Sequence, residues 1–250
     1  MKRILLASTA LAFIAGPALA ADLPSRQPAP APQTFTAPPV FTWTGFYAGV
    51  NLGWNQNEMS VRNRGFTGDA SPGSYNPFSS RTNSFIGGFQ VGYNQQFDMF
   101  VAGVEADLSY LGNRRSTGSA AVTGGGQSTG VMATSRLDWL GTVRARAGVA
   151  MDQVFVYGTG GLAFGAPDQR LNVMNNNTTV ATGRNSDTRV GWTLGAGAEF
   201  AVMDNLSFKA EYLYYDLGRT TVRATGAGGT NAARFENKGH IVRAGMNYRF

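Results

Sequence analysis

Residues 239–250, GHIVRAGMNYRF, decide how the rest of the sequence is interpreted. In an extended chain, successive residues point to opposite faces. One face would carry His240, Val242, Ala244, Met246, Tyr248 and Phe250. The other would carry Ile241, Arg243, Gly245, Asn247 and Arg249. Alternation with a period of two predicts a β-strand with one apolar face. If the pattern recurs upstream until the number of strands is even, this strand closes a transmembrane barrel.

The same alternation recurs in seven earlier segments. The predicted strands are 46–55, 84–97, 100–110, 136–149, 154–165, 188–200, 206–216 and 239–250. In the clearest of them, 100–110, Phe100, Val104 and Leu108 alternate with Glu105 and Asp107. Each strand therefore has an apolar face for lipid and a polar face for an interior.

The connections between these segments alternate in length. Three connections are short, namely 98–99, 150–153 and 201–205. The others are long and rich in Gly, Ser, Thr and Asn. The long connections are 56–83, 111–135, 165–187 and 217–238. Residues 45–250 are therefore predicted to form an all-β fold, an eight-stranded antiparallel transmembrane β-barrel with short periplasmic turns and long extracellular loops.

The N-terminal residues predict export. Lys2 and Arg3 precede an apolar run over 4–14, and Ala18-Leu19-Ala20 forms a small-x-small cleavage site, so residues 1–20 are predicted to be a signal peptide. Residues 21–44 hold six prolines and are predicted to be a mobile periplasmic linker. No cysteine occurs in the chain, which excludes a disulfide framework. The expected location is the bacterial outer membrane.

On the apolar faces of the predicted strands, aromatic residues lie near the strand ends. Small and aliphatic residues occupy the middle of each strand. Those near the short turns are Phe46, Phe97, Phe100, Phe200, Phe208, Tyr248 and Phe250. Those near the long loops are Trp54, Phe85, Tyr110, Trp139, Phe164, Trp192 and Tyr214. Two such girdles are typical of membrane interfaces, whereas a soluble β-sandwich or lipocalin-like cup would place its aromatics centrally. The girdles favour a membrane barrel.

Four stretches carry a family resemblance. They are Trp43–Gly53 (WTGFYAGVNLG), Val91–Tyr110 (VGYNQQFDMFVAGVEADLSY), Leu206–Gly218 (LSFKAEYLYYDLG) and Val242–Phe250 (VRAGMNYRF). With these stretches, residues 43–250 resemble the small alphaproteobacterial outer-membrane barrels called immunogenic or RopB-type proteins, and more distantly the OmpA barrel. The resemblance implies a surface antigen. It also implies that Tyr248 and Phe250 form the signal that the barrel-assembly machinery recognises.

The inward phase of the predicted barrel is charged. The candidate interior network is Glu105, Asp107, Arg144, Arg146, Arg189, Glu199, Lys209, Glu211, Arg243 and Arg249. An eight-stranded barrel is only wide enough for side chains to fill it, so opposite charges are expected to pair and plug the lumen. Glu105 or Asp107 with Arg144 or Arg146 are the best candidate pairs. An ion path lined by the same charges is the alternative.

The predicted loops are basic, with eleven Arg or Lys and five Asp or Glu. Candidate contacts to phosphorylated lipopolysaccharide are Arg62, Arg64, Arg114, Arg115, Arg219 and Arg223. Arginine forms charge-assisted hydrogen bonds with phosphate, which suits an outer-leaflet partner. In the alternative interpretation, these charged residues only keep the loops soluble. Nucleic acid is not an expected partner of an exported chain.

Catalysis is not expected, because His240 is the only histidine and Val242 stands where a His-x-Ser arrangement would need serine. No catalytic, cofactor-binding or metal-ligating residue is predicted, and no cofactor. The sequence predicts a monomeric structural barrel that supports envelope integrity and contacts lipopolysaccharide. A narrow, low-conductance porin is the alternative, and an enzyme acting on outer-leaflet lipid is a third class.

Overall fold

The computed structural model describes residues 41–67, 77–112, 115–124, 127–175, 178–226 and 229–250. The predicted signal peptide, most of the predicted linker and Arg114 lie outside these residues. The described residues form twelve strands: β1 (Gly45–Thr67), β2 (Phe78–Phe97), β3 (Phe100–Leu111), β4 (Ser116–Gly124), β5 (Gln127–Arg136), β6 (Trp139–Met151), β7 (Val154–Gly165), β8 (Asp168–Asn175), β9 (Thr178–Asn185), β10 (Arg189–Met203), β11 (Leu206–Gly226) and β12 (Gly229–Arg249). No helix in this part of the chain is long and apolar enough to cross a membrane.

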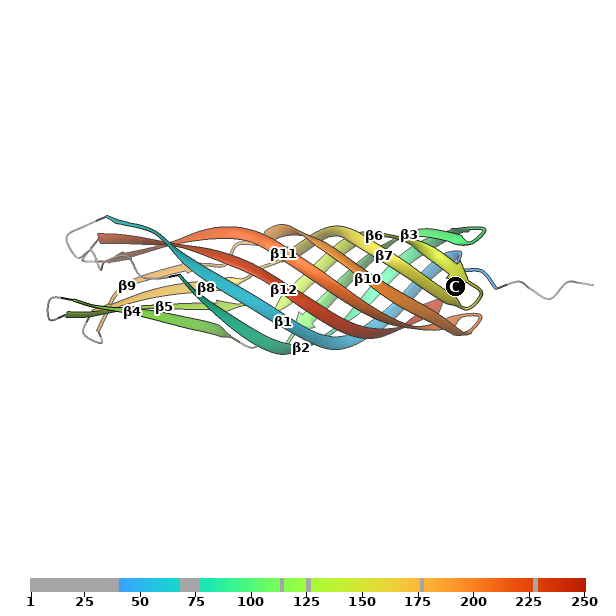
Figure 1. The fold of residues 1–250 in the computed structure, drawn as a ribbon, viewed down its shortest axis with the longest axis horizontal. Helices are drawn as coiled ribbons and strands as arrows, with labels where there is room; N and C mark the ends of the chain where they lie inside the picture. The colour runs from blue at the N-terminus through green and yellow to red at the C-terminus, as the bar shows by residue number, and fades with distance from the viewer. Residues whose placement is uncertain (1–40, 68–76, 113–114, 125–126, 176–177, 227–228) are drawn as a thin grey trace, which may run out of the picture. The chain divides into compact units, whose positions relative to one another are not determined.

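Eight of the twelve strands close a ring (Figure 1). Their order is β1, β2, β3, β6, β7, β10, β11 and β12, with β12 hydrogen-bonded back to β1. Every neighbouring pair is antiparallel. Each of these strands overlaps one predicted segment, although 136–149 begins in β5, and 188–200 and 239–250 each extend one residue beyond their strand. The prediction of eight strands in all was wrong, because four more lie outside the ring.

Three two-residue turns join ring strands at one end, which we call the turn end. They are Asp98-Met99, Asp152-Gln153 and Asp204-Asn205. Asp98 and Asp152 have φ of 54° and 50°, the left-handed region that tight hairpins need and that aspartate tolerates. The C-terminal strand ends here too, because the Arg249 amide donates to the Asn205 carbonyl at 2.8 Å. The predicted short turns are confirmed.

The predicted long loops are mostly strands. β1, β2, β11 and β12 continue far beyond the predicted ends, and β4, β5, β8 and β9 occupy much of 111–135 and 165–187. Together with the outer halves of β1, β2, β11 and β12, these four strands form what we call the extension. Two sheets make it, β2–β1–β12–β11 and β4–β5–β8–β9, joined by a short β9–β11 pairing at residues 181–182 and 225–226.

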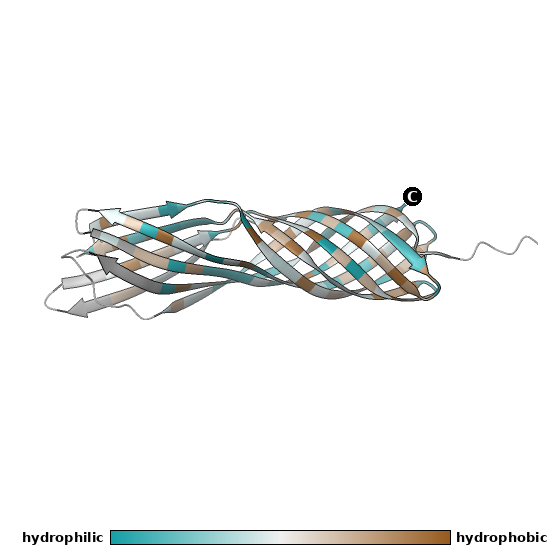
Figure 2. Ribbon diagram, turned by 90° about the horizontal axis from the view of Figure 1, so that it is seen from above, coloured by the Kyte–Doolittle hydropathy of each residue, from teal (hydrophilic) through white to brown (hydrophobic). Residues whose placement is uncertain are grey.

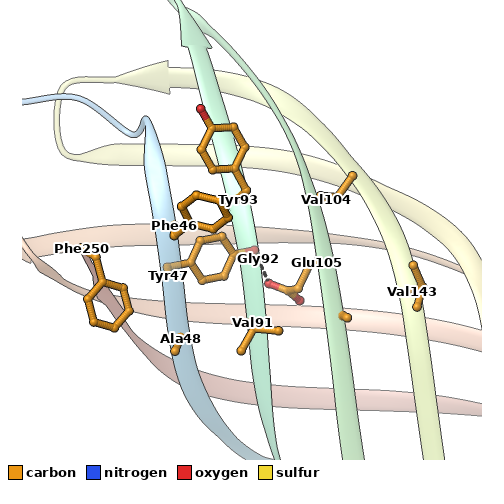
Figure 3. Close-up of a pocket in the computed structure, with 11 residues that line it drawn as sticks. Phe46, Tyr47, Ala48, Val91, Gly92, Tyr93, Val104, Glu105, Val143 and Phe250 are labelled. Carbon is orange, nitrogen blue, oxygen red and sulfur yellow. Dashed lines mark hydrogen bonds between the residues drawn. The ribbon is translucent and has the colours of Figure 1, made fainter.

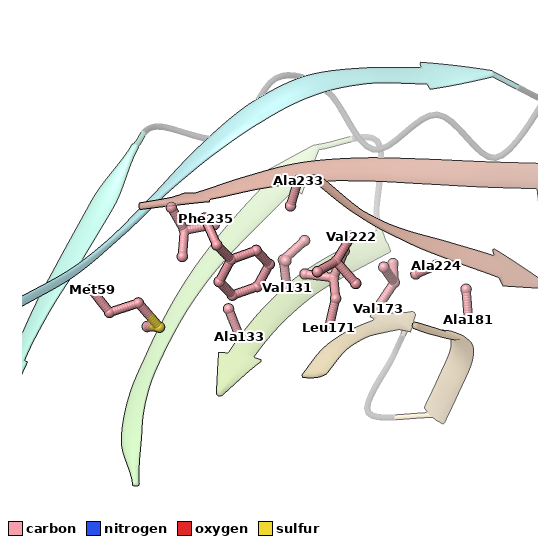
Figure 4. Close-up of a cluster of buried hydrophobic side chains, with 11 residues drawn as sticks. Met59, Val131, Ala133, Leu171, Val173, Ala181, Val222, Ala224, Ala233 and Phe235 are labelled. Atoms are coloured by element: carbon pink, nitrogen blue, oxygen red, sulfur yellow. The ribbon is translucent and has the colours of Figure 1, made fainter. Parts of the chain in front are cut away.

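The two sheets of the extension enclose an apolar core (Figure 4). Its buried members are Met59, Val61, Val131, Ala133, Leu171, Val173, Ala181, Val222, Ala224, Ala233 and Phe235. Both sheets contribute side chains, so each buries its inner face against the other. The sequence prediction missed this core because its strands lie within stretches that are rich in turn-forming residues.

The ring has the opposite polarity from the extension. Its outward face exposes large apolar side chains, such as Phe46, Leu52 and Trp54 on β1, at 67%, 59% and 61%. Figure 2 shows hydrophobic residues recurring along these strands. The inward face of the same strand carries buried Asn51 and Asn55. The predicted assignment of apolar residues to the outside of the wall is therefore confirmed for this strand.

Candidate functional site

The interior of the ring is built in three layers. At the turn end lies a cap of buried apolar residues: Trp43, Val101, Ala150, Phe155, Tyr157 and Ala201, with Phe41 packed against them. Nearer the extension lies a second apolar layer: Ile86, Leu111, Leu137, Leu140, Ala163, Leu213, Tyr215, Leu217 and Ile241. Between the two lies a layer of ionised side chains, which we call the charge belt.

The charge belt balances four acids with four bases. Its members are Glu105, Asp107, Glu199 and Glu211 with Arg144, Arg146, Lys209 and Arg243. Their side chains are almost completely removed from solvent. All eight are among the predicted interior residues. Because buried charges are costly when unpaired, equal numbers of each sign are what a closed interior requires.

Arg144 contacts three acids of the belt. Its guanidinium lies 2.5 Å from Glu105, 2.9 Å from Glu211 and 3.1 Å from Asp107. Glu105 and Arg144 are also direct partners in the β3–β6 ladder, so the backbone register brings them together. Thr142 completes the arrangement by donating its hydroxyl to Asp107.

Glu105 is the most heavily paired acid. Lys209 donates to both of its carboxylate oxygens at 2.9 Å, and Arg146 lies 3.1 Å away. The Tyr47 hydroxyl donates to it at 2.8 Å, as the dashed line in Figure 3 marks. These contacts come from β1, β6 and β11, so the belt joins strands on different sides of the ring.

Arg146 connects the belt to the cap. One nitrogen lies 2.7 Å from Glu199, and the guanidinium carbon lies 4.2 Å from the centre of the Tyr157 ring. Such stacking of a cation on an aromatic face is most favourable away from water. The cap and the belt are therefore packed as one unit.

Trp43 fills the turn end of the ring. It is 1% exposed, its indole nitrogen donates to the Asp152 carbonyl at 3.1 Å, and its ring centre lies 5.4 Å from that of Phe155. Residues 41–44 were predicted to belong to the mobile linker, and for these residues the prediction was wrong. Burial of the large apolar ring of Trp43 stabilises the ordered position of these residues.

Two predicted members lie outside the charge belt. Arg189 lies ten residues from Glu199 on β10, about 33 Å along a strand, and contacts Asp187 at 3.7 Å. Arg249 lies at the turn end, where it donates to the Asp204 carbonyl at 2.6 Å and covers the Phe41 ring at 4.6 Å. Strand phase placed both inward, but depth along the strand separates them from the acids.

Several uncharged residues of the interior were not predicted to join the network of charges. Tyr47 and Tyr157 hydrogen-bond belt acids. A chain of amides also crosses the interior: Asn51 donates to Gln90 at 2.5 Å, Gln90 to Asn247 at 2.7 Å, and Asn247 to Glu199 at 2.8 Å. The signal that could have found them is strand phase, since all of them alternate with outward residues.

Tyr248 and Phe250, the predicted assembly signal, lie on the outward face at the turn end. They are 48% and 79% exposed, and their ring centres are 5.2 Å apart. Phe250 also borders a groove of about 420 Å³ with Phe46, Tyr93 and Val104, shown in Figure 3. The groove is lined mainly by outward apolar residues, which suits contact with lipid chains.

Four of the six predicted lipopolysaccharide contacts are exposed side chains of the extension: Arg62, Arg115, Arg219 and Arg223. Arg219 is paired with Glu236 at 2.7 Å. Arg64 lies on β1, but its side chain is not described, and Arg114 lies outside the described residues. The exposed arginines are spread along different strands rather than gathered at one site.

His240 is bound to a neighbour in the wall. Its Nδ1 lies 2.6 Å from the Tyr212 hydroxyl, and the Tyr214 ring centre lies 5.3 Å from that of the imidazole. Within the described residues, no group of three His, Asp or Glu side chains is arranged to hold a metal ion.

A closed antiparallel ring with an apolar outer face and a polar interior is the architecture of an outer-membrane barrel. Residues 7–250 match the family model of the outer membrane protein beta-barrel domain, and the chain belongs to this family. The protein is therefore located in the bacterial outer membrane.

Two relatives and one solved structure illustrate the likeness. The 31 kDa outer-membrane immunogenic protein of Brucella melitensis is 37% identical over 255 residues, covering 100% of both chains. The 22 kDa outer membrane protein of Rhizobium leguminosarum bv. viciae is 32% identical, over 71% of this chain and 66% of that protein. The outer membrane protease OmpT of Escherichia coli has a TM-score of 0.46 at 11% identity, over 82% of this chain and 97% of that chain.

Proposed function

We propose that the protein is a structural, surface-exposed barrel whose eight ring strands span the outer membrane and whose lumen is closed. The observation that carries this proposal is the charge belt, enclosed between two apolar layers. A hydrated ion crossing the ring would have to displace paired charges and also pass two layers built mainly of apolar side chains. The turn end would face the periplasm and the extension the exterior.

Planar bilayer recordings test the closed lumen. The purified protein is expected to give no reproducible single-channel steps. Glu105→Gln, which keeps the shape but removes one belt charge, should stay equally silent, because the apolar layers remain. Steps in the wild type whose size changes in Glu105→Gln would instead support the narrow, low-conductance porin.

The closed barrel would contribute to envelope integrity as a monomer, without catalysis, and would contact lipopolysaccharide through the extension. The tyrosine contact of His240 on the outward face supports a place in the wall rather than at a reaction centre. A strain lacking the protein is expected to be more sensitive to bile salts or detergent, with full rescue by the wild type and by His240→Gln. Rescue by the wild type alone would contradict the non-catalytic role.

Assembly machinery is proposed as a transient partner that recognises the terminal strand. Deleting Phe250 should reduce the amount of folded barrel in the outer membrane more than it lowers the stability of barrel that has folded. The Phe250 ring is largely exposed, so its removal opens no buried cavity. Tyr212→Ala, an outward change elsewhere in the wall, is the matched control. Equal losses of assembly and stability would reduce Phe250 to an interfacial anchor.

A further inference from the structure

A polar pocket lies on the outer surface of the extension, away from the charge belt. It has a volume of about 190 Å³ and is lined by Arg115, Thr134, Arg136, Asp168, Arg170 and Asn172. Arg136 and Asp168 are direct partners in the β5–β8 ladder, as are Thr134 and Arg170. Neighbouring positions such as Ala133 and Leu171 point the other way, into the apolar core. The pocket is therefore a feature of the sheet surface and not of a loop.

The pocket carries more positive than negative charge. Arg170 and Arg184 oppose each other in the β8–β9 ladder, an unfavourable juxtaposition of like charges unless an anion lies between them. Asp168 supplies one carboxylate, 3.4 Å from Arg170 and 3.0 Å from Arg184. One carboxylate cannot neutralise two guanidinium groups, so positive charge remains.

The other two arginines add to this excess. Arg136 is paired with Asp138 at 2.5 Å, and Arg115 forms no ion pair with any described residue. Around the pocket, four arginines thus face two aspartates, Asp138 and Asp168. Each guanidinium presents five N–H donors, so the paired arginines retain donors for a further anion. Planar arginine side chains favour phosphate oxygens in particular.

The depth of the pocket identifies where that anion would come from. Tyr110 and Trp139 form an outward aromatic pair at the extension end of the ring, with ring centres 5.1 Å apart. Arg136 ends β5 and Trp139 begins β6, so only Leu137 and Asp138 separate the pocket from this aromatic pair. The Leu111 amide donates to the Asp138 carbonyl at 2.8 Å and holds the two chain segments together at this level. Aromatic pairs mark the membrane interface, so the pocket lies at the height of outer-leaflet headgroups.

We propose that this pocket binds a phosphate group of an outer-leaflet lipid, with Arg115, Arg136 and Arg170 as the donors. This inference rests on the proposed function, because that proposal places the extension outside an outer leaflet of phosphorylated lipopolysaccharide. It also narrows the lipopolysaccharide contact to one site. Of the six arginines expected from the sequence, only Arg115 belongs to this pocket.

Binding of lipid A to the purified protein in lipid nanodiscs tests the site. The two probes are lipid A with both phosphates and the same lipid A with its phosphates removed. The wild type is expected to bind the phosphorylated form at least about tenfold more tightly, as hydrogen bonds to a charged group require. Arg115→Gln combined with Arg170→Gln should remove this preference. Arg81→Gln combined with Lys238→Gln changes the net charge equally, outside the pocket, and should keep this preference.

Heat-modifiable migration on a denaturing gel shows that each variant has folded. Equal binding of both forms of lipid A by the wild type, or an equal loss in both double variants, would overturn the proposal. Titration with inorganic phosphate separates the two sources of the anion. Displacement of lipid A by inorganic phosphate at micromolar concentration would identify a site for the free ion and overturn the lipid assignment.

The outcomes also separate this site from the closed lumen. A silent bilayer together with phosphate-independent binding would overturn the pocket and leave the closed barrel intact. Conductance steps together with phosphate-dependent binding would overturn the proposal of a closed lumen and support the proposed phosphate site.

Discussion

The ring and the extension share four continuous strands but distribute polar and apolar residues in opposite ways. Along β1, inward Asn51 and Asn55 give way to inward Met59 and Val61, all of them buried. Outward residues change in the reverse sense, from exposed Leu52 and Trp54 to Glu58, Ser60 and Arg62. The backbone and its pairing continue across this change. The surroundings of the strand, lipid or water, therefore dictate which face is apolar.

The comparison implies that the two regions depend on different interactions for their stability. Arg144→Ala should have the largest effect, because it removes one base that contacts three buried acids. Breaking a buried ion pair in this way costs about 3–5 kcal/mol. Unfolding in urea, followed in lipid vesicles by tryptophan fluorescence, measures the loss.

Arg189→Ala is the matched control for that experiment. Its side chain is 30% exposed and its nearest acid lies 3.7 Å away, so the expected change is below about 1 kcal/mol. Equal losses in the two variants would contradict the distinction between the charge belt and the rest of the inward phase.

The extension should respond to a cavity instead of a lost charge. Leu171 is 1% exposed and lies on β8, a strand that takes no part in the ring. Leu171→Ala should destabilise the extension by about 2–5 kcal/mol, seen as faster proteolysis there. Heat-modifiable migration of the ring should persist.

Leu52→Ala shortens an outward side chain of the ring that is 59% exposed, and it should leave proteolysis of the extension unchanged. If Leu171→Ala abolished heat-modifiable migration as well, the ring and the extension would unfold as one cooperative unit.

We expect a smaller loss of stability from a substitution at the β-bulge where the ring meets the extension. The β11–β12 register shifts between Asp216 and Arg219, and Gly218 there has a φ of 73°. A side chain at Gly218 would meet nothing within 4 Å, so Gly218→Ala should cost only the left-handed backbone penalty, about 1–2 kcal/mol. Gly130→Ala, whose nearest contact would be 3.9 Å away, should change stability by less than about 1 kcal/mol. Urea midpoints compare the two, and equal shifts would remove the special role of Gly218.

Acidification should give the smallest loss of stability, and this loss is expected in the extension. Partial burial opposes ionisation of Asp168, but hydrogen bonds from Arg184 and Arg170 outweigh it and lower the pKa of this carboxyl. A lowered pKa in the folded state adds stability above the unfolded pKa and loses it as pH falls through the folded value. The contribution of such a surface pair is below about 1 kcal/mol. Proteolysis of the extension should rise slightly below about pH 4, and Asp168→Asn should remove that component.

The sequence predicted the ring better than the extension for a physical reason. In the ring, Val, Leu, Phe and Trp alternate with polar residues, so the period of two is clear and the eight segments fall in the right places. In the extension the core includes small residues such as Ala133, Ala181 and Ala224 beside a few large ones, and its strands contain Gly, Ser, Thr and Asn. That composition is also typical of loops, and only pairing between distant segments distinguishes the two.

The candidate site shows the same limit. Strand phase was sufficient to place Glu105, Arg144 and six other charges in the interior. Phase alone also placed Arg189 and Arg249 in the network, because it gives the face of a strand and not the depth, and these two residues lie near the ends of their strands. Strand phase also could not predict the position of Trp43. This residue precedes β1, and the chain there folds back so that its side chain lies inside the ring.

The pairing of β1 with β12 has a consequence for the order of folding. The two strands are joined from Tyr47–Arg249 to Thr67–Thr230, nearly the whole length of each. Contacts this distant in sequence are slow to form. Until the last strand arrives, β1 keeps an unpaired edge that is open to aggregation, and Arg243 is missing from the acids it neutralises. Unfolded chains therefore need shelter until β12 has paired with β1, and a chain truncated within β12 should aggregate instead of forming a smaller barrel.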